Sequence, residues 1–333
     1  MKAYRRISSF LLGFVLLLAG LLKLMDPVGA SLAVESYLGF LHLGFLRPAS
    51  MFLAETLSFL ETLVGIGLCC GVSRKIVALA SGILMGAYTL LTLLVLVLNP
   101  SLDCGCFGEA IHLSHGWSFV KNLALCGLWC AAFLPWRDFG APKVSRWVAF
   151  GLSCALCAGF GVRCLFTLPP VDFTGFAPGA EIGMDGDDTG FSICDADGEY
   201  RDSLLVDGAV LICAISDSSD VDLLQVGETL RGAAGLGIRP VAVSPLRIES
   251  LGEISYSADR RAIMSLCRSN GGFVYLFRGQ IVSKWTASDP PSAEELSALL
   301  ETNPTDHLLT SQRRARLAVE GGLGLLLLIM LAL

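Results

Sequence analysis

The fold class of this chain follows from residues 76–98, which read IVALASGILMGAYTLLTLLVLVL. This run carries no charged side chain, and it exceeds the roughly 20 apolar residues that an α-helix needs to cross the hydrocarbon core of a bilayer. Two other apolar runs are weaker candidates for membrane spans. The run 119–136 is slightly short, and the run 317–333 is near the minimum length and contains Glu320. The sequence predicts an α-helical membrane bundle with spans at residues 7–25, 52–72, 76–98, 119–136, 147–168 and 317–333.

The composition indicates that a soluble part is joined to this bundle. Of the 333 residues, 53% are hydrophobic and only 16% are charged, against about a quarter in an ordinary soluble domain. These values exclude a disordered chain, a single soluble domain and a charge-driven nucleic-acid partner. Residues 167–312 hold 22 acidic and 9 basic side chains, a net charge of −13, whereas the rest of the chain carries +7. We expect a membrane domain at 1–136, an additional membrane helix in 137–168, a soluble domain at 169–312 and a C-terminal membrane helix in 313–333.

The short loops set the expected orientation, because cytoplasmic loops are rich in Lys and Arg. The basic residues before the first span and in two alternate loops are Lys2, Arg5, Arg6, Arg74, Lys75, Arg137, Lys143 and Arg146. The loop 99–118 has none, so it is predicted to face outward, as is the domain 169–312. We expect a bacterial inner (cytoplasmic) membrane protein with a cytoplasmic N-terminus and a periplasmic domain. Arg313, Arg314 and Arg316 are an exception to this pattern, and a signal peptide cleaved near Ala30 is an alternative for the first run.

Two cysteines in the outward loop are the strongest candidates for chemistry. Cys104 and Cys106 flank Gly105, and in an extended chain their Cα atoms lie about 6.6 Å apart, near the limit for a disulfide. A strained, exposed disulfide is easily reduced, which suits thiol–disulfide exchange in an oxidising compartment. A static disulfide is one alternative. A zinc site formed by Cys104, Cys106, His112 and His115 is another.

Charged residues in the apolar runs are candidates to assist this pair. Lys23 ends the first span and Lys121 opens the fourth, and a nearby ammonium lowers the pKa of a thiol. An unpaired carboxylate within a span is costly, so we expect Glu55, which lies nearer the outer face than Glu61, to pair with Lys23. Asp26 lies three residues after Lys23 and is a further binding candidate. A purely structural ion pair is an equally good interpretation of these charges.

The acidic domain reads as alternating strands and helices. The apolar run 208–215 predicts a buried central strand, which is followed by the loop Ser216-Asp217-Ser218-Ser219-Asp220. Cys194 and Cys213 are expected to be buried apolar residues, whereas Cys267 could approach this loop. We expect strands at 191–195, 208–215, 239–244, 273–277 and 280–285, and helices at 220–233, 260–268 and 292–301, the last capped by Ser292 with Glu295.

Three sequence blocks resemble the DoxX-like family, specifically its methylamine-utilisation MauE branch. They are LKLMDP at 22–27, DCGCFG at 103–108 and FVKN at 119–122, within a resemblance that covers about residues 5–135. The resemblance implies a four-helix membrane core, a role in redox maturation or disulfide formation in a periplasmic partner, and work beside a thioredoxin-like protein. It carries the reactive role onto Cys104 and Cys106.

The soluble domain resembles the thioredoxin-like fold in its order of elements, its terminal hairpin and its last helix. It departs from that pattern at two places, because the loop 216–220 lacks the Cys-x-x-Cys motif and the segment 270–272 lacks the proline expected there. The segment with Arg268 and Asn270 resembles degenerate domains of this type fused to DoxX-like cores. The resemblance implies that this domain binds a partner, through Arg268 and Asn270, without exchanging disulfides itself.

These observations favour a membrane thiol–disulfide oxidoreductase or maturation factor. Its partners would be periplasmic protein thiols or a thioredoxin-like protein, with membrane lipid around the bundle and a quinone as the candidate electron acceptor. The first alternative is a non-catalytic membrane scaffold or chaperone that binds through the degenerate thioredoxin-like domain. A small-molecule permease is a weaker alternative, motivated by Lys23, Glu55 and Glu61 within the spans.

Overall fold

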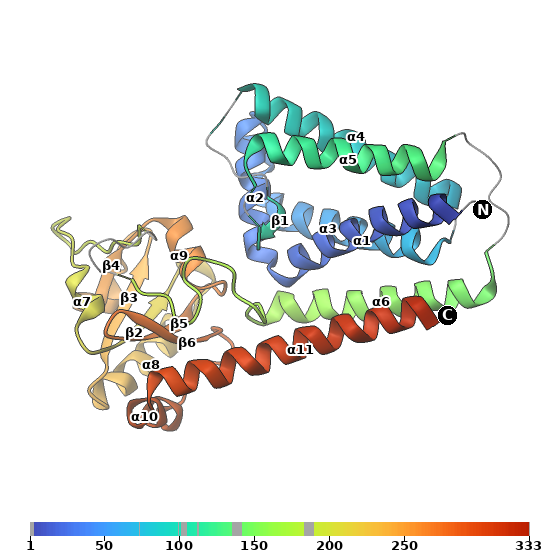
Figure 1. Cartoon of the computed structure of the whole chain (residues 1–333). Coiled ribbons are helices and arrows are strands. Elements are labelled where there is room, and N and C mark those ends of the chain that lie inside the picture. Colours follow the sequence, from blue (N-terminus) through green and yellow to red (C-terminus); the bar gives the residue numbers. More distant parts are fainter. Residues whose placement is uncertain are drawn as a thin grey trace. The chain divides into compact units, whose positions relative to one another are not determined.

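The computed structural model describes residues 3–72, 74–98, 100, 105–111, 113–134, 142–182 and 190–332. It divides into two compact units (Figure 1). The membrane unit comprises Met1–Phe166 and Glu320–Leu333, and the soluble unit comprises Thr167–Val319. Each is described by itself below.

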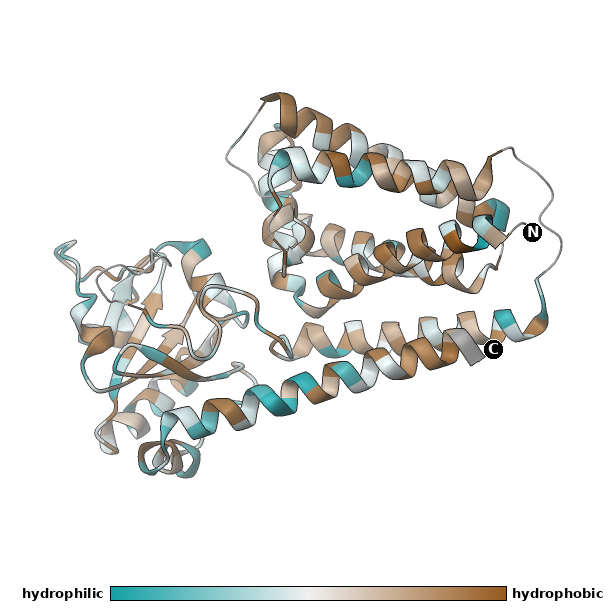
Figure 2. Ribbon diagram, in the orientation of Figure 1, coloured by the Kyte–Doolittle hydropathy of each residue, from teal (hydrophilic) through white to brown (hydrophobic). Residues whose placement is uncertain are grey.

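The membrane unit is built from long helices. Its elements are α1 (Ala3–Met25), α2 (Pro27–Phe40), the 3₁₀ helix η1 (Gly44–Ala49), α3 (Ser50–Cys70), α4 (Arg74–Leu98), the short strand β1 (Cys106–Glu109), α5 (His115–Phe133) and α6 (Val144–Phe166). Figure 2 shows that α1, α3, α4 and α6 are mostly hydrophobic along their length. A mostly helical, apolar N-terminal region was expected, and it is confirmed.

Helices α1 and α3 pack closely because small residues lie between them. A β-carbon at Gly20 would lie 2.3 Å from the Thr62 Oγ1, and one at Gly65 would lie 2.5 Å from the Leu17 backbone nitrogen. Small residues at such positions let two membrane helices approach closely, where dispersion forces hold them together. The contact fixes the register of α1 against α3, and this register determines which of their polar side chains meet.

Four stretches of the described chain are long and apolar enough to cross a membrane: Ala3–Met25, Gly44–Cys70, Arg74–Leu98 and Val144–Phe166. They correspond to the predicted spans 7–25, 52–72, 76–98 and 147–168. The spans predicted at 119–136 and 317–333 coincide with α5 and the C-terminal helix α11 (Pro304–Ala332). The described residues of these two helices are not among the stretches that are long and apolar enough to cross a membrane. These two spans stay predictions.

Helix α2 was missing from the predicted elements. The Asp26 side chain caps it by accepting a hydrogen bond from the Gly29 amide at 2.9 Å, and Pro27 occupies its first turn. Asp followed by Pro is a helix-start signal, since a carboxylate satisfies an otherwise unpaired amide and proline lacks one to satisfy. Asp26, proposed as a binding residue, is therefore the N-cap of a helix.

The soluble unit contains a five-stranded sheet in the order β4-β3-β2-β5-β6. Strand β2 runs parallel to β3 and antiparallel to β5, and β5 and β6 form an antiparallel hairpin. The strands are β2 (Ala209–Ala214), β3 (Arg239–Ser244), β4 (Ser255–Ser257), β5 (Gly272–Phe277) and β6 (Gln280–Trp285). The helices are α7 (Ser203–Val206), η2 (Ser218–Asp220), α8 (Leu223–Gly235), η3 (Glu249–Ile254), α9 (Arg260–Leu266) and α10 (Ala293–Glu301).

Strand β2 separates two hydrophobic clusters, one on each face of the sheet. Val210 and Ile212 point to one cluster, and Leu211 and Cys213 point to the other. Successive side chains of a strand alternate between faces, so a continuous apolar run is what a strand covered on both sides requires. The prediction of a buried central strand is confirmed.

Most predicted elements of this unit are found, with two corrections. The hairpin and the Ser292–Glu295 capping box are present as expected. The strand predicted at 191–195 is wrong, because only Cys194 pairs there, in isolated bridges to Tyr200 and Ser257. The helix predicted from Asp220 begins at Leu223, because Asp222 accepts the capping hydrogen bonds and Asp220 lies in the preceding 3₁₀ turn.

Candidate functional site

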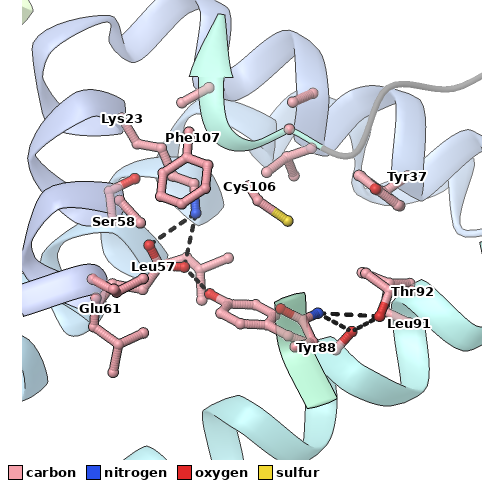
Figure 3. A pocket seen from close by; sticks show the side chains of 18 of the residues that line it. Lys23, Tyr37, Leu57, Ser58, Glu61, Tyr88, Leu91, Thr92, Cys106 and Phe107 are labelled. Carbon is pink, nitrogen blue, oxygen red and sulfur yellow. Dashed lines mark hydrogen bonds and ion pairs between the residues drawn. The ribbon is translucent and has the colours of Figure 1, made fainter. Parts of the chain in front are cut away.

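A cavity of about 110 Å³ lies inside the membrane unit (Figure 3). Most of its wall is apolar, and a few polar groups converge on it. A concave apolar site with a small number of placed polar groups is the usual form of a binding or reaction site. The polar and sulfur-bearing side chains that line it are Lys23, Tyr37, Ser58, Glu61, Tyr88, Thr92, Cys106, Lys121 and Asn122.

A buried ion pair forms the centre of the polar cluster. The Lys23 Nζ lies 2.8 Å from both carboxylate oxygens of Glu61, whose side chain is 1% exposed. The Tyr88 hydroxyl donates a hydrogen bond to the Glu61 Oε1 (Figure 3). An isolated charge is costly in the apolar interior, so lysine, carboxylate and phenol compensate one another there.

The predicted pairing of Lys23 with Glu55 is wrong. Glu55 was favoured by its depth in the span, but residues six apart on a helix point about 120° away from each other at 3.6 residues per turn. The face of α3 that carries Glu61 is the one that meets Lys23. The Glu55 Oε1 is buried without a hydrogen-bond partner. Depth alone was therefore an insufficient criterion.

A second set of hydrogen bonds ties α5 to α4 beside the ion pair. The Asn122 Nδ2 donates to the Tyr88 carbonyl oxygen and to the Thr92 Oγ1, each at 3.1 Å. Tyr88 and Thr92 were not among the predicted site residues. Their spacing of four places both on one face of α4, and polar residues on a single face of an otherwise apolar run would have indicated this site.

Cys106 lies at the same cavity. It is disulfide-bonded, whereas the other described cysteines are free. Cys104 and His112 lie outside the described residues. The preceding Gly105 has a φ of +60°, a conformation that a side chain would strain, and a β-carbon there would lie 3.1 Å from the Ala33 Cβ. The turn that brings Cys106 to the cavity thus depends on glycine.

Lys121 lines the same cavity and contacts Phe107, the residue that follows Cys106. Its Nζ is 4.7 Å from the centre of the Phe107 ring, within range of a cation–π contact. Among the described side chains that line the cavity, Lys23 and Lys121 are the cations and Glu61 is the carboxylate. The cavity therefore carries one excess positive charge beside a sulfur atom. This arrangement stabilises an anion such as a thiolate.

The zinc alternative stays a prediction, because two of its four ligands, Cys104 and His112, lie outside the residues that the structure describes. The described residues contain no group of three His, Cys, Asp or Glu side chains that could hold a metal ion. Cys106 is oxidised, and a disulfide sulfur is not the thiolate that zinc requires. Of the other proposed ligands, His115 is described and begins α5.

In the soluble unit, Asn270 holds the loop that follows the central strand. Its Oδ1 accepts hydrogen bonds from the amides of Ser216 and Asp217 at 2.8 and 3.0 Å, and its Nδ2 donates to the Asp217 carbonyl oxygen at 2.8 Å. Arg268 instead donates to the Met264 carbonyl oxygen at 3.0 Å. Asn270 therefore fixes the shape of this loop.

The buried cysteines of this unit are poor nucleophiles. Burial raises the pKa of both Cys213 and Cys267 above the ordinary value of a thiol. Cys267 lies against β6, with its Sγ 3.8 Å from the Trp285 carbonyl oxygen. A thiol with a raised pKa is almost entirely protonated near neutral pH, and only the thiolate attacks a disulfide.

Comparison with known proteins finds a family match within the membrane unit. No curated protein and no solved structure matches the chain. Residues 1–137 match the family model of methylamine utilisation protein MauE. That range contains the cavity, its ion pair and Cys106. Residues 1–137 of this chain are therefore similar to the MauE family, and the match covers the membrane-spanning part that holds the candidate site.

Proposed function

We propose that the membrane unit exchanges disulfides with protein thiols on the outer, periplasmic side of the membrane, through Cys104 and Cys106. The observation that carries the proposal is the oxidised Cys106 at a cavity with two lysines and one carboxylate. The excess positive charge favours the thiolate that forms when the disulfide opens, and a better leaving thiolate speeds exchange.

The reaction balances as a two-electron exchange. A partner thiolate attacks one sulfur of the Cys104–Cys106 disulfide, the S–S bond breaks, and a mixed disulfide forms. A second partner thiolate then attacks the mixed disulfide, which leaves the partner oxidised and the pair as a dithiol. The partner has lost two electrons and two protons in total. Return of the pair to the disulfide delivers them to an acceptor of the quinone class, which is lipid-soluble and becomes a quinol.

The soluble unit supports this exchange by binding. Its sheet order, hairpin and capped last helix are consistent with a thioredoxin-like fold, and the loop 216–220 carries serine and aspartate where an active member carries cysteines. Asn270 contacts this loop, and Arg268 lies two residues before Asn270 on the segment that precedes β5. In this proposal the loop contacts a periplasmic partner or a thioredoxin-like protein, and the chemistry takes place at the membrane unit.

The test uses the purified full chain and a reduced model peptide with two cysteines. Wild-type protein, once oxidised, is expected to convert about one equivalent of peptide to its disulfide. Replacement of both cysteines, Cys104→Ser with Cys106→Ser, abolishes this conversion. Cys130→Ser is the matched control, since Cys130 is a free and exposed cysteine on α5, and it leaves the yield unchanged.

The scaffold alternative makes the opposite prediction. It is favoured by one observation, the absence of cysteine from the loop 216–220. If the double variant oxidises the peptide as well as wild type, or wild type does not oxidise it at all, the exchange reaction is wrong and binding remains as the function.

A further inference from the structure

A cluster of basic side chains lies at the end of the membrane unit where α3 ends and α4 and α6 begin. A β-carbon placed at Gly71 would lie 3.3 Å from the Arg74 Nη2 and 3.5 Å from the Arg146 Nη1. Arg74 lies on α4 and Arg146 lies on α6. Because both nitrogen atoms lie so close to the same point, the Arg74 Nη2 and the Arg146 Nη1 are at most about 7 Å apart, a distance at which like charges repel appreciably. Arg5 and Arg74 both line a narrow crevice beside this point.

The charge of this end is strongly positive. Its described segments 3–9, 71–72, 74–77 and 142–148 contain six Lys or Arg residues and no acidic residue. Two of the arginines also serve the fold, because the Arg74 Nε donates to the Gly71 carbonyl oxygen at 3.4 Å and the Arg5 Nη2 donates to the Leu134 carbonyl oxygen at 2.5 Å. A guanidinium has five N–H donors, so these helix-end contacts and an anion can be held by the same side chains.

The surface next to the cluster is apolar. Ile7 is 58% exposed, Ile76 is 70% exposed and Val148 is 47% exposed. Trp147, which follows Arg146, is 45% exposed, and tryptophan is enriched where headgroups meet hydrocarbon. Basic groups beside an exposed apolar surface match a molecule with an anionic head and an apolar tail, whereas a free phosphate ion would use the basic groups alone.

We propose that this end of the membrane unit binds the headgroup phosphate of an anionic phospholipid, with Arg146 and Arg74 as the principal cations and Arg6 beside them. Basic pockets between membrane helices bind acidic lipid headgroups by the same electrostatics. The lipid phosphate relieves the repulsion between the guanidinium groups, and its acyl chains cover the apolar surface at Ile7, Ile76 and Val148. The proposal is independent of the disulfide chemistry.

Thermal unfolding of the purified full chain in a neutral detergent tests the proposal. Added phosphatidylglycerol is expected to raise the unfolding temperature of wild type by several degrees more than phosphatidylcholine does. The Arg146→Gln variant is expected to lose most of this difference in unfolding temperature between the two lipids. Arg163→Gln is the matched control, since it removes the same charge at the other end of α6, and it keeps the difference.

Three outcomes would overturn the proposal. The first is that phosphatidylglycerol and phosphatidylcholine raise the unfolding temperature of wild type equally. The second is that Arg163→Gln loses as much of the difference between the two lipids as Arg146→Gln does. The third is that inorganic phosphate at the same concentration reproduces the effect of phosphatidylglycerol. The first and third comparisons need only wild type. If Arg146→Gln does not fold, Arg6→Gln on the exposed start of α1 replaces it, with the same loss of lipid preference expected.

Discussion

At the scale of single residues, the contact between Lys23 and Glu61 decides how the membrane unit tolerates charge. Removal of one partner of a buried ion pair leaves the other uncompensated, at a cost of about 3–5 kcal/mol. Glu61→Gln is therefore expected to lower the unfolding temperature of the detergent-solubilised protein markedly. The combined change Lys23→Met with Glu61→Leu is expected to be milder, because it removes both charges. Circular dichroism at helical wavelengths measures both effects.

Glu55→Gln is the control for this prediction. Glu55 lies on the same helix, α3, six residues away, and its Oε1 has no hydrogen-bond partner. Its neutralisation is expected to leave the unfolding temperature close to that of wild type. Equal losses in Glu61→Gln and Glu55→Gln would show that the ion pair contributes nothing specific.

At the scale of elements, the Lys284–Asp172 ion pair joins β6 to the segment that enters the soluble unit. Its atoms lie 2.7 Å apart, and the two side chains are 7% and 13% exposed. Burial raises the pKa of Asp172, but the Lys284 ammonium and hydrogen bonds from Thr174 outweigh it, so the pKa lies below the ordinary value of an aspartate. The folded state thus favours the ionised carboxylate.

The sign of the pH dependence follows from this lowered pKa. The stabilisation is complete above the unfolded-state pKa, about 3.9, and is lost as the pH falls through the lower folded-state value. Asp172→Asn is expected to destabilise the soluble unit at neutral pH, and its difference from wild type should shrink below about pH 4. Asp207→Asn removes an exposed partner of Arg239 and should lower the free energy of unfolding by about 0–1 kcal/mol. A difference for Asp172→Asn that stays constant down to pH 2 would contradict this account.

The elements also show how far sequence reasoning reaches. Apolar runs fix the existence of α1, α3, α4 and α6, since length and composition alone determine whether a helix can span a membrane. Helix α2 was not predicted because no long apolar run marks it, although Asp26 and Pro27 signal its start. Glu61, the partner of Lys23, was not predicted for a different reason. The pairing depends on the rotation of α3 about its axis, which the packing of small residues against α1 sets and which hydropathy does not report.

At the scale of the whole molecule, the chain joins a membrane unit, which matches the MauE family model over residues 1–137, to a soluble mixed-sheet unit. The free cysteines of the soluble unit that lie in its core have raised pKa values, and the disulfide-bonded cysteine lies in the membrane unit. This distribution supports the proposal that disulfide exchange takes place at the membrane unit. In the proposed function, the loop 216–220, which Asn270 holds in place, is the surface that recognises the partner.

The most direct test of the account measures the redox state of the Cys104–Cys106 pair in intact cells. A membrane-impermeant maleimide of high mass is applied before and after a mild reductant, with and without inhibition of respiration. We expect labelling of the pair from outside only after reduction in respiring cells, and labelling without reductant once respiration is blocked. Labelling that requires permeabilised cells, or a pair that stays oxidised whether or not the cells respire, would contradict the account.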